Sequence, residues 1–62
     1  MNGDNKARFM KVYSDLPINI RREVIAIIDG EPISWNIAFL EIKNETEIGE
    51  KILNKLILLG FI

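Results

Sequence analysis

The dipeptide Asp29-Gly30, set between two runs of apolar residues, constrains the fold of this chain more than any other feature of its sequence. A two-residue hairpin turn needs central residues that accept positive φ, and Asp-Gly is one of the pairs that meet this requirement best. The sequence therefore predicts a strand over residues 23–28 and a short return strand that ends at Ile33. Pro32 has no backbone N–H to donate to a sheet, so we expect the return strand to lie at an edge.

The same stretch also fits a helical pattern, which leaves a second fold open. The residues at helical spacing are Ile20, Val24, Ile27 and Ile28. In this alternative the protein is all-α, with four short helices, and Gly30 ends one of them. The β-branched run over residues 24–28 favours the strand, because branching at Cβ suits a pleated surface and restricts side chains in a helix.

Helices are predicted on both sides of the hairpin. The first has Asp4 as its N-cap and ends before Pro17, because the residue that precedes a proline is disfavoured in the helical region. A second helix is predicted over residues 35–43, with Ser34 as its N-cap. The alternation of Trp35, Ile37 and Phe39 leaves open a strand that extends the hairpin. This order of elements predicts an α+β fold for residues 1–62, which we expect to form a single small domain.

The last helix is predicted over residues 46–59. Asn44 and Glu47 have the spacing of a capping box, so Asn44 is the expected N-cap. Gly60 is placed to end the helix in a left-handed conformation. Gly49 either marks a close approach of another segment or occupies a first-turn position where helix propensity matters little.

Periodicity predicts which side chains form the core. Leu59 is assigned to the buried stripe of the last helix, together with Ile48, Ile52, Leu53 and Leu56. The residues expected at the centre of the fold are Phe9, Tyr13, Val24, Ile27, Trp35, Phe39, Ile52 and Leu56.

Small domains usually need support beyond their own core, and this chain lacks two common kinds. Its 62 residues include no cysteine and no histidine, which excludes disulfides and transition-metal sites built on thiolate or imidazole ligands. Oligomerisation or partner binding is the remaining support.

The end of the chain is the expected contact surface. Eight of the twelve residues in Lys51–Ile62 are large and apolar, and the four consecutive ones in Leu56–Leu59 point all around the helix axis. The residues expected at an interface are Ile57, Leu58, Phe61 and Ile62. These features predict a non-catalytic protein–protein interaction module, most simply a homodimer formed through the C-terminal helix.

The charge distribution supports an alternative function. Residues 1–22 carry five basic and two acidic groups, a net charge of +3, whereas residues 23–62 carry three basic and seven acidic groups, a net charge of −4. A small antitoxin-type regulator could use the acidic half against a basic protein or the basic half against DNA. The candidate DNA contacts are Arg8, Lys11, Arg21 and Arg22. The isoelectric point near 5.3 weighs against nucleic acid.

Other functional classes find little support. The two serines, Ser14 and Ser34, adjoin predicted helix boundaries, and without histidine or cysteine we expect no enzyme activity, no metal or cofactor site and no small-molecule substrate. No apolar run is long enough to span a bilayer, so no membrane contact is expected. A cytoplasmic location is expected, because the first residues do not resemble an export signal.

Several short motifs resemble a class of short archaeal proteins of unknown function. They are Leu16-Pro17, Arg21-Arg22-Glu23-Val24, residues 29–35, Glu41-Ile42 and Thr46-Glu47-Ile48-Gly49. That class carries a Ser/Thr-Trp pair after a small hairpin, followed by Glu-Ile and Thr-Glu-x-Gly. The Leu-Pro pair with Arg-x-Glu-Val is also similar to the start of some small antitoxin-type proteins. Neither resemblance implies a catalytic or binding residue.

Overall fold

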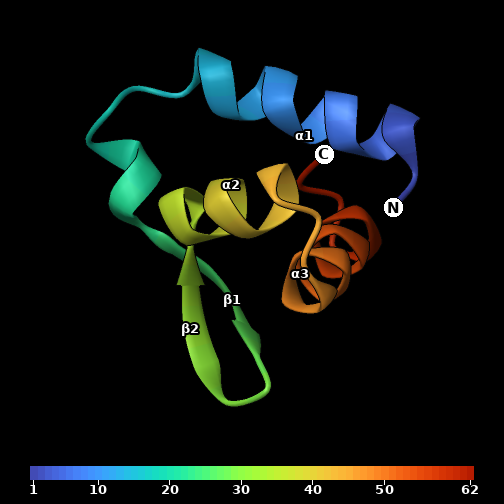
Figure 1. Ribbon diagram of the computed structural model, residues 1–62. Coiled ribbons are helices and arrows are strands. Elements are labelled where there is room, and N and C mark those ends of the chain that lie inside the picture. The colour runs from blue at the N-terminus through green and yellow to red at the C-terminus, as the bar shows by residue number, and fades with distance from the viewer.

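A β-hairpin inserted between one helix and a pair of helices defines the architecture (Figure 1). The computed structural model describes residues 1–62. Its elements are α1 (Gly3–Asp15), the 3₁₀ turn η1 (Ile20–Arg22), β1 (Val24–Ile28), β2 (Glu31–Ser34), α2 (Trp35–Lys43) and α3 (Glu47–Leu58). This order confirms the predicted α+β class, and the all-α alternative is wrong.

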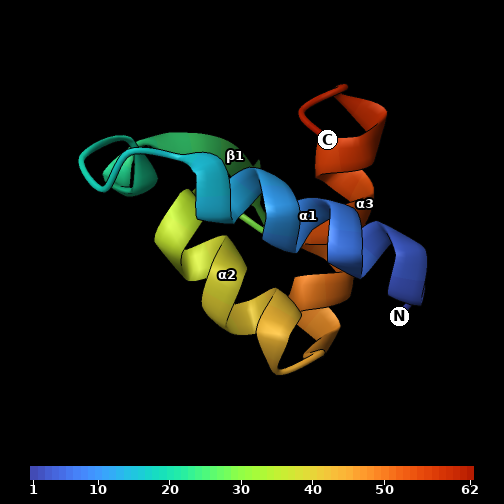
Figure 2. The ribbon, with the colours of Figure 1, turned by 90° about the horizontal axis from the view of Figure 1, so that it is seen from above.

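The helices surround a small core above the hairpin. In Figure 1, α1 runs along the top, α2 lies beneath it, and the hairpin extends downward from the start of α2. Figure 2 shows α1 passing over α3, and α1 contacts both α2 and α3. The largest fully buried side chains are Phe9, Ile42, Ile52, Leu53 and Leu56. The core therefore joins α1 to the two C-terminal helices.

The hairpin turns at the predicted residues. Asp29 and Gly30 have φ values of 51° and 81°, and Ile28 pairs directly with Glu31 across the turn. Both central residues lie in the left-handed region, as this class of turn requires. The prediction of a hairpin at this position is confirmed.

The buried face of β1 is not the one the sequence predicted. Ala26 and Ile28 face the core, whereas Val24 and Ile27 are each 58% exposed, so their assignment to the core is wrong. The position of the turn decides which residues of β1 face the core, because successive strand residues point to opposite faces of the sheet. An irregularity between Val24 and Ala26 shifts the register at the start of the strand. All five residues are apolar, so hydrophobicity could not select the buried face.

The aromatic residues of the predicted core are partly confirmed. Phe9 and Trp35 are buried, as are the two predicted residues of α3, Ile52 and Leu56. Tyr13 and Phe39 are only half-buried, and their rings stack with centroids 4.4 Å apart. This stack ties α1 to α2 at the edge of the core.

The N-cap of α1 is Asn2, which corrects the assignment to Asp4. The Asn2 Oδ1 accepts hydrogen bonds from the backbone N–H groups of Asp4 and Asn5, at 2.9 and 3.1 Å. Asp4 lies in the first turn, where its charge favours the helix N-terminus. At the other end, Leu16 is extended before Pro17, as predicted.

A tight corner joins α2 to α3. Glu45 has a φ of 52°, and its N–H donates to the carbonyl of Ile42, while the N–H of Thr46 donates to the carbonyl of Glu41. These two hydrogen bonds form a Schellman motif, in which the residue after the C-cap is left-handed. The chain thus reverses within three residues.

Thr46 also begins α3, so the prediction of Asn44 as the N-cap is wrong. The Thr46 hydroxyl accepts from the N–H of Gly49 at 2.9 Å and donates to the Glu41 carboxylate at 2.6 Å. Asn44 is instead the C-cap of α2. A Cβ on Gly49 would overlap the backbone carbonyl of Glu41, so this glycine marks a close approach between the two helices.

Candidate interaction surface

The C-terminal end of α3 is closed by a second Schellman motif. Gly60 has a φ of 79°, its N–H donates to the carbonyl of Ile57, and the N–H of Phe61 donates to the carbonyl of Leu56. This geometry confirms the predicted cap at Gly60. It folds the chain back, so that the Phe61 ring meets the Trp35 ring edge-on, with centroids 6.1 Å apart.

The four predicted interface residues divide into two kinds. Leu58 is 80% exposed and Phe61 is 45% exposed. Ile57 and Ile62 are half-buried and pack against the core. The structure therefore leaves Leu58 with the largest uncovered apolar surface, and it uses Ile57 and Ile62 to close the fold.

Leu59 belongs to this surface, although its spacing assigned it to the buried stripe of α3. It is 51% exposed, so that assignment is wrong. Leu59 is the C-cap, and the chain turns back directly after it. Helical periodicity alone does not show where the neighbouring elements stop covering a stripe.

A groove separates the hairpin tip from α3. Its volume is about 390 Å³, and it opens widely to the surroundings. The residues that line it are Ile27, Ile28 and Asp29 from the hairpin, and Lys51, Asn54, Lys55 and Leu58 from α3. Leu58 is therefore part of a surface that also includes Ile27, a residue that the sequence placed in the core.

The groove carries little net charge. The Lys51 Nζ lies 2.9 Å from the Asp29 Oδ2, and this hydrogen bond and the carboxylate charge raise the pKa of Lys51 above its ordinary value. Lys55 has no ion-pair partner in the chain. Since Lys51 and Asp29 neutralise one another, Lys55 is the single uncompensated charge of the lining.

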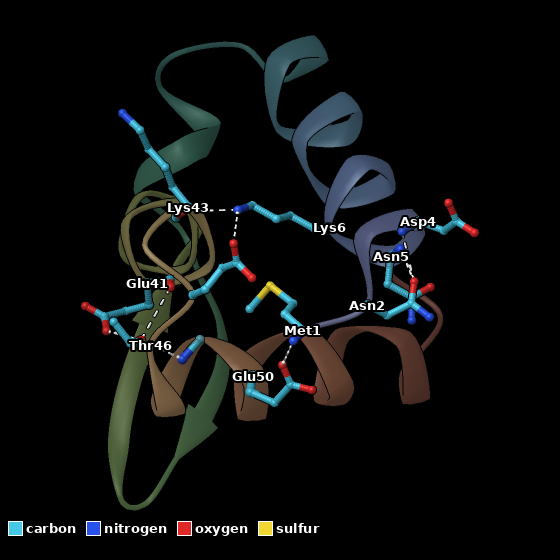
Figure 3. Close-up of polar contacts among 11 residues, drawn as sticks. Met1, Asn2, Asp4, Asn5, Lys6, Glu41, Lys43, Thr46 and Glu50 are labelled. Carbon is cyan, nitrogen blue, oxygen red and sulfur yellow. Dashed lines mark hydrogen bonds and ion pairs between the residues drawn. The ribbon is translucent and has the colours of Figure 1, made fainter.

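Polar contacts of a different kind hold α1 to the α2–α3 corner (Figure 3). The Lys6 Nζ donates to the Lys43 carbonyl at 3.2 Å and to the Glu45 carboxylate at 2.9 Å. The hydrogen bond and the charge of Lys6 lower the pKa of Glu45 below its ordinary range. Lys6 thus supplies a positive charge at the C-terminal end of α2, where the helix dipole is negative.

The four candidate DNA contacts lie in different environments. The Arg21 guanidinium lies over the Tyr13 ring, 4.4 Å from its centroid, and donates to the Ser14 carbonyl at 3.4 Å. Lys11 pairs with Asp15 within α1 at 3.1 Å. Arg8 and Arg22 are exposed. Arg21 therefore has a structural role in packing η1 against α1, and the DNA-binding role of these residues stays a prediction.

The structure also bears on metal sites and membrane-spanning helices. No three side chains among His, Cys, Asp and Glu come together in an arrangement that could hold a metal ion. None of the helices combines the length and the apolar character needed to cross a membrane.

No protein-family model, curated protein or solved structure matches this chain. Its resemblance to the short archaeal proteins stays a prediction.

Proposed function

We propose that this chain is a non-catalytic protein–protein interaction module that self-associates through the C-terminal end of α3. The observation that carries the proposal is the exposure of Leu58, which is 80% accessible on a helix whose other face forms the core. Leu59 and Phe61 add exposed apolar surface within three residues of it. Exposed apolar side chains that gather at one place, rather than singly, are typical of interaction sites.

Burial of these apolar side chains by a second copy would contribute substantially to the stability of the folded chain. Fully burying a leucine or phenylalanine side chain contributes about 1.5–3 kcal/mol. The total stability of a small domain is only about 5–15 kcal/mol. A second copy that covers Leu58 and Phe61 would therefore stabilise the folded chain by a substantial fraction of that total.

Sedimentation equilibrium across the micromolar range tests the proposal. The unmodified chain is expected to dimerise, and Leu58→Lys is expected to be monomeric, because it places a charge in the apolar contact. Leu40→Lys is the matched control, since Leu40 is also an exposed leucine, 55% accessible, but lies on α2. This control should dimerise like the unmodified chain.

A chain that stays monomeric at high micromolar concentration, with a thermal midpoint independent of concentration, would overturn the proposal. Equal loss of dimer in both lysine variants would also count against it, because the contact would then not be specific to α3.

A further inference from the structure

The two outer edges of the hairpin differ in what they offer to another strand. In a two-residue hairpin the pair that closes the turn is hydrogen-bonded, here Ile28 and Glu31. The next pair, Ile27 and Pro32, is therefore a non-hydrogen-bonded pair whose backbone groups point away from each other. Pro32 has no N–H to present at the edge of β2, whereas Ile27 presents both its N–H and its C=O at the edge of β1.

The exposed edge of β1 opens into the groove described above. Three consecutive hairpin residues, 27–29, line one side of the groove, and the other side is α3. No residue of β2 contributes to the lining, so the groove lies along the edge of β1 that faces away from β2. The backbone groups of Ile27 are thus next to a space that another chain can enter.

Natural proteins protect strand edges with charges, prolines or bulges, because an open edge pairs with other strands. The edge of β2 has both Glu31 and Pro32. β1 consists of Val-Ile-Ala-Ile-Ile, without a charge or a proline. Its one irregularity lies between Val24 and Ala26, so the regular and unprotected part of the edge is Ala26–Ile28.

We infer that β1 is the strand through which two copies of this chain join. The two β1 strands pair in antiparallel orientation about a two-fold axis at Ile27, and the two hairpins become one four-stranded sheet. Each Ile27 N–H donates to the Ile27 carbonyl of the other copy, so the axis makes the two hydrogen bonds equivalent. This inference rests on the proposed self-association and specifies its geometry.

The chemistry of the groove favours a second copy as its occupant. Asp29 and Lys51 neutralise each other, and only Lys55 is uncompensated, so the groove suits a strand with little charge. β1 is such a strand, and its β-branched side chains favour a sheet. Two facing Ile27 side chains also form an apolar cross-strand pair, the kind of contact that stabilises antiparallel sheets.

A stable dimer needs more buried area than the edge of β1 provides, so residues at the end of α3 must contribute. A standard interface buries about 800 Å² on each partner, which is about a fifth of the 3924 Å² surface of this chain. Pairing over Ala26–Ile28 alone is too short to supply this area. A two-fold axis perpendicular to the sheet places both α3 helices on the same face of it, so Leu58, which lines the same groove, adds to the interface.

Amide hydrogen exchange of the full chain, measured by NMR above and below its dimer dissociation constant, tests the geometry. The Ile27 amide is expected to be protected in the dimer and to exchange rapidly in the monomer, because its N–H has no partner within the chain. A synthetic chain with Ile27→N-methylisoleucine removes both intermolecular hydrogen bonds and should weaken the dimer at least about 30-fold. Ile27→Val keeps the N–H and serves as the matched control, which should still dimerise.

The outcomes separate the two proposals. If the chain dimerises but Ile27 exchanges equally fast at both concentrations, the β1 pairing is wrong and association through α3 stands. The same conclusion follows if a folded N-methyl variant dimerises as tightly as the unmodified chain. If the unmodified chain is monomeric throughout, both proposals are wrong. Exchange in the unmodified chain decides the matter even if the N-methyl variant does not fold.

Discussion

The two Schellman motifs of this chain use the same hydrogen bonds for different purposes. At the α2–α3 corner, Glu45 takes the left-handed position, and at the end of α3, Gly60 takes it. In both motifs, one N–H donates to the carbonyl five residues earlier, and another N–H donates to the carbonyl three residues earlier. The two motifs differ in how much exposed apolar surface lies beside them. The corner is held by Thr46, Gly49 and Lys6, whereas the C-terminal turn lies beside exposed apolar residues.

This difference shows how one local structure can support stability or present a surface, according to what packs around it. At the corner, two helices approach so closely that one position has no room for a methyl group. At the end of α3, Leu58 has no covering element in the chain. We therefore expect substitutions at the corner to have the larger effect on folding, and substitutions of the exposed residues at the end of α3 to have the larger effect on association.

The largest effect is expected for Gly49→Ala. The added Cβ would overlap the backbone carbonyl of Glu41, and backbone cannot move aside as a flexible side chain can. Overpacking of this kind costs about 3 kcal/mol, which is measurable as a lower urea midpoint. Gly3→Ala is the control, because nothing lies within 4 Å of its Cβ position and its stability should change little. Equal stability of the two variants would contradict the close approach.

A smaller effect is expected for Gly60→Ala. Alanine in the left-handed region costs about 1 kcal/mol, although there is open space around this Cβ position. The same urea experiment measures this loss. A loss as large as that of Gly49→Ala would show that the C-terminal turn supports the fold as strongly as the corner does. That result would remove the contrast between the two motifs.

The smallest effect is a pH dependence at the corner. A carboxyl group whose folded pKa is lowered stabilises the fold above its unfolded pKa, about 4.3 for glutamate, and this contribution is lost as the pH falls through the folded pKa. Lys6 lowers the pKa of Glu45, so the stability difference between the unmodified chain and Lys6→Met should shrink below about pH 4.3. Urea midpoints measured across the acidic range give this difference.

Lys11→Met is the control for this measurement. It removes an ion pair with Asp15 that lies wholly within α1 and in which both side chains are more exposed than those of Lys6 and Glu45. Its effect on stability should be smaller at every pH. A Lys6→Met difference that does not change with pH would show that the hydrogen bond to the Lys43 carbonyl, not the charge of Glu45, holds α1 to the corner.

The sequence determined most of the element boundaries, because these depend on residues with special backbone requirements. Asp29-Gly30 predicted the position of the hairpin turn, and Pro17 predicted the end of α1. Ser34 predicted the start of α2, and Gly60 predicted the end of α3. Each of these signals acts on the residue itself or its immediate neighbours, so it needs no knowledge of the rest of the fold.

Where two nearby residues can both cap a helix, the sequence analysis selected the wrong one. Asn2 caps α1 in place of Asp4, and Thr46 caps α3 in place of Asn44. The choice at α3 follows from the reversal of the chain at Glu45, which places the Thr46 hydroxyl between the Glu41 carboxylate and the first turn of α3.

For β1 and for Leu59, only the tertiary structure decided whether an apolar residue stays exposed. Every residue of β1 is apolar, so the buried face depended on the register counted from the turn and not on hydrophobicity. Leu59 fits a buried stripe by spacing, but no element reaches far enough to cover it. Local signals fix where a helix or strand begins and ends, whereas burial depends on how far the other elements extend. The sequence predicted Leu58 as an interface residue, but only the folded molecule shows that Ile27 lies on the same surface.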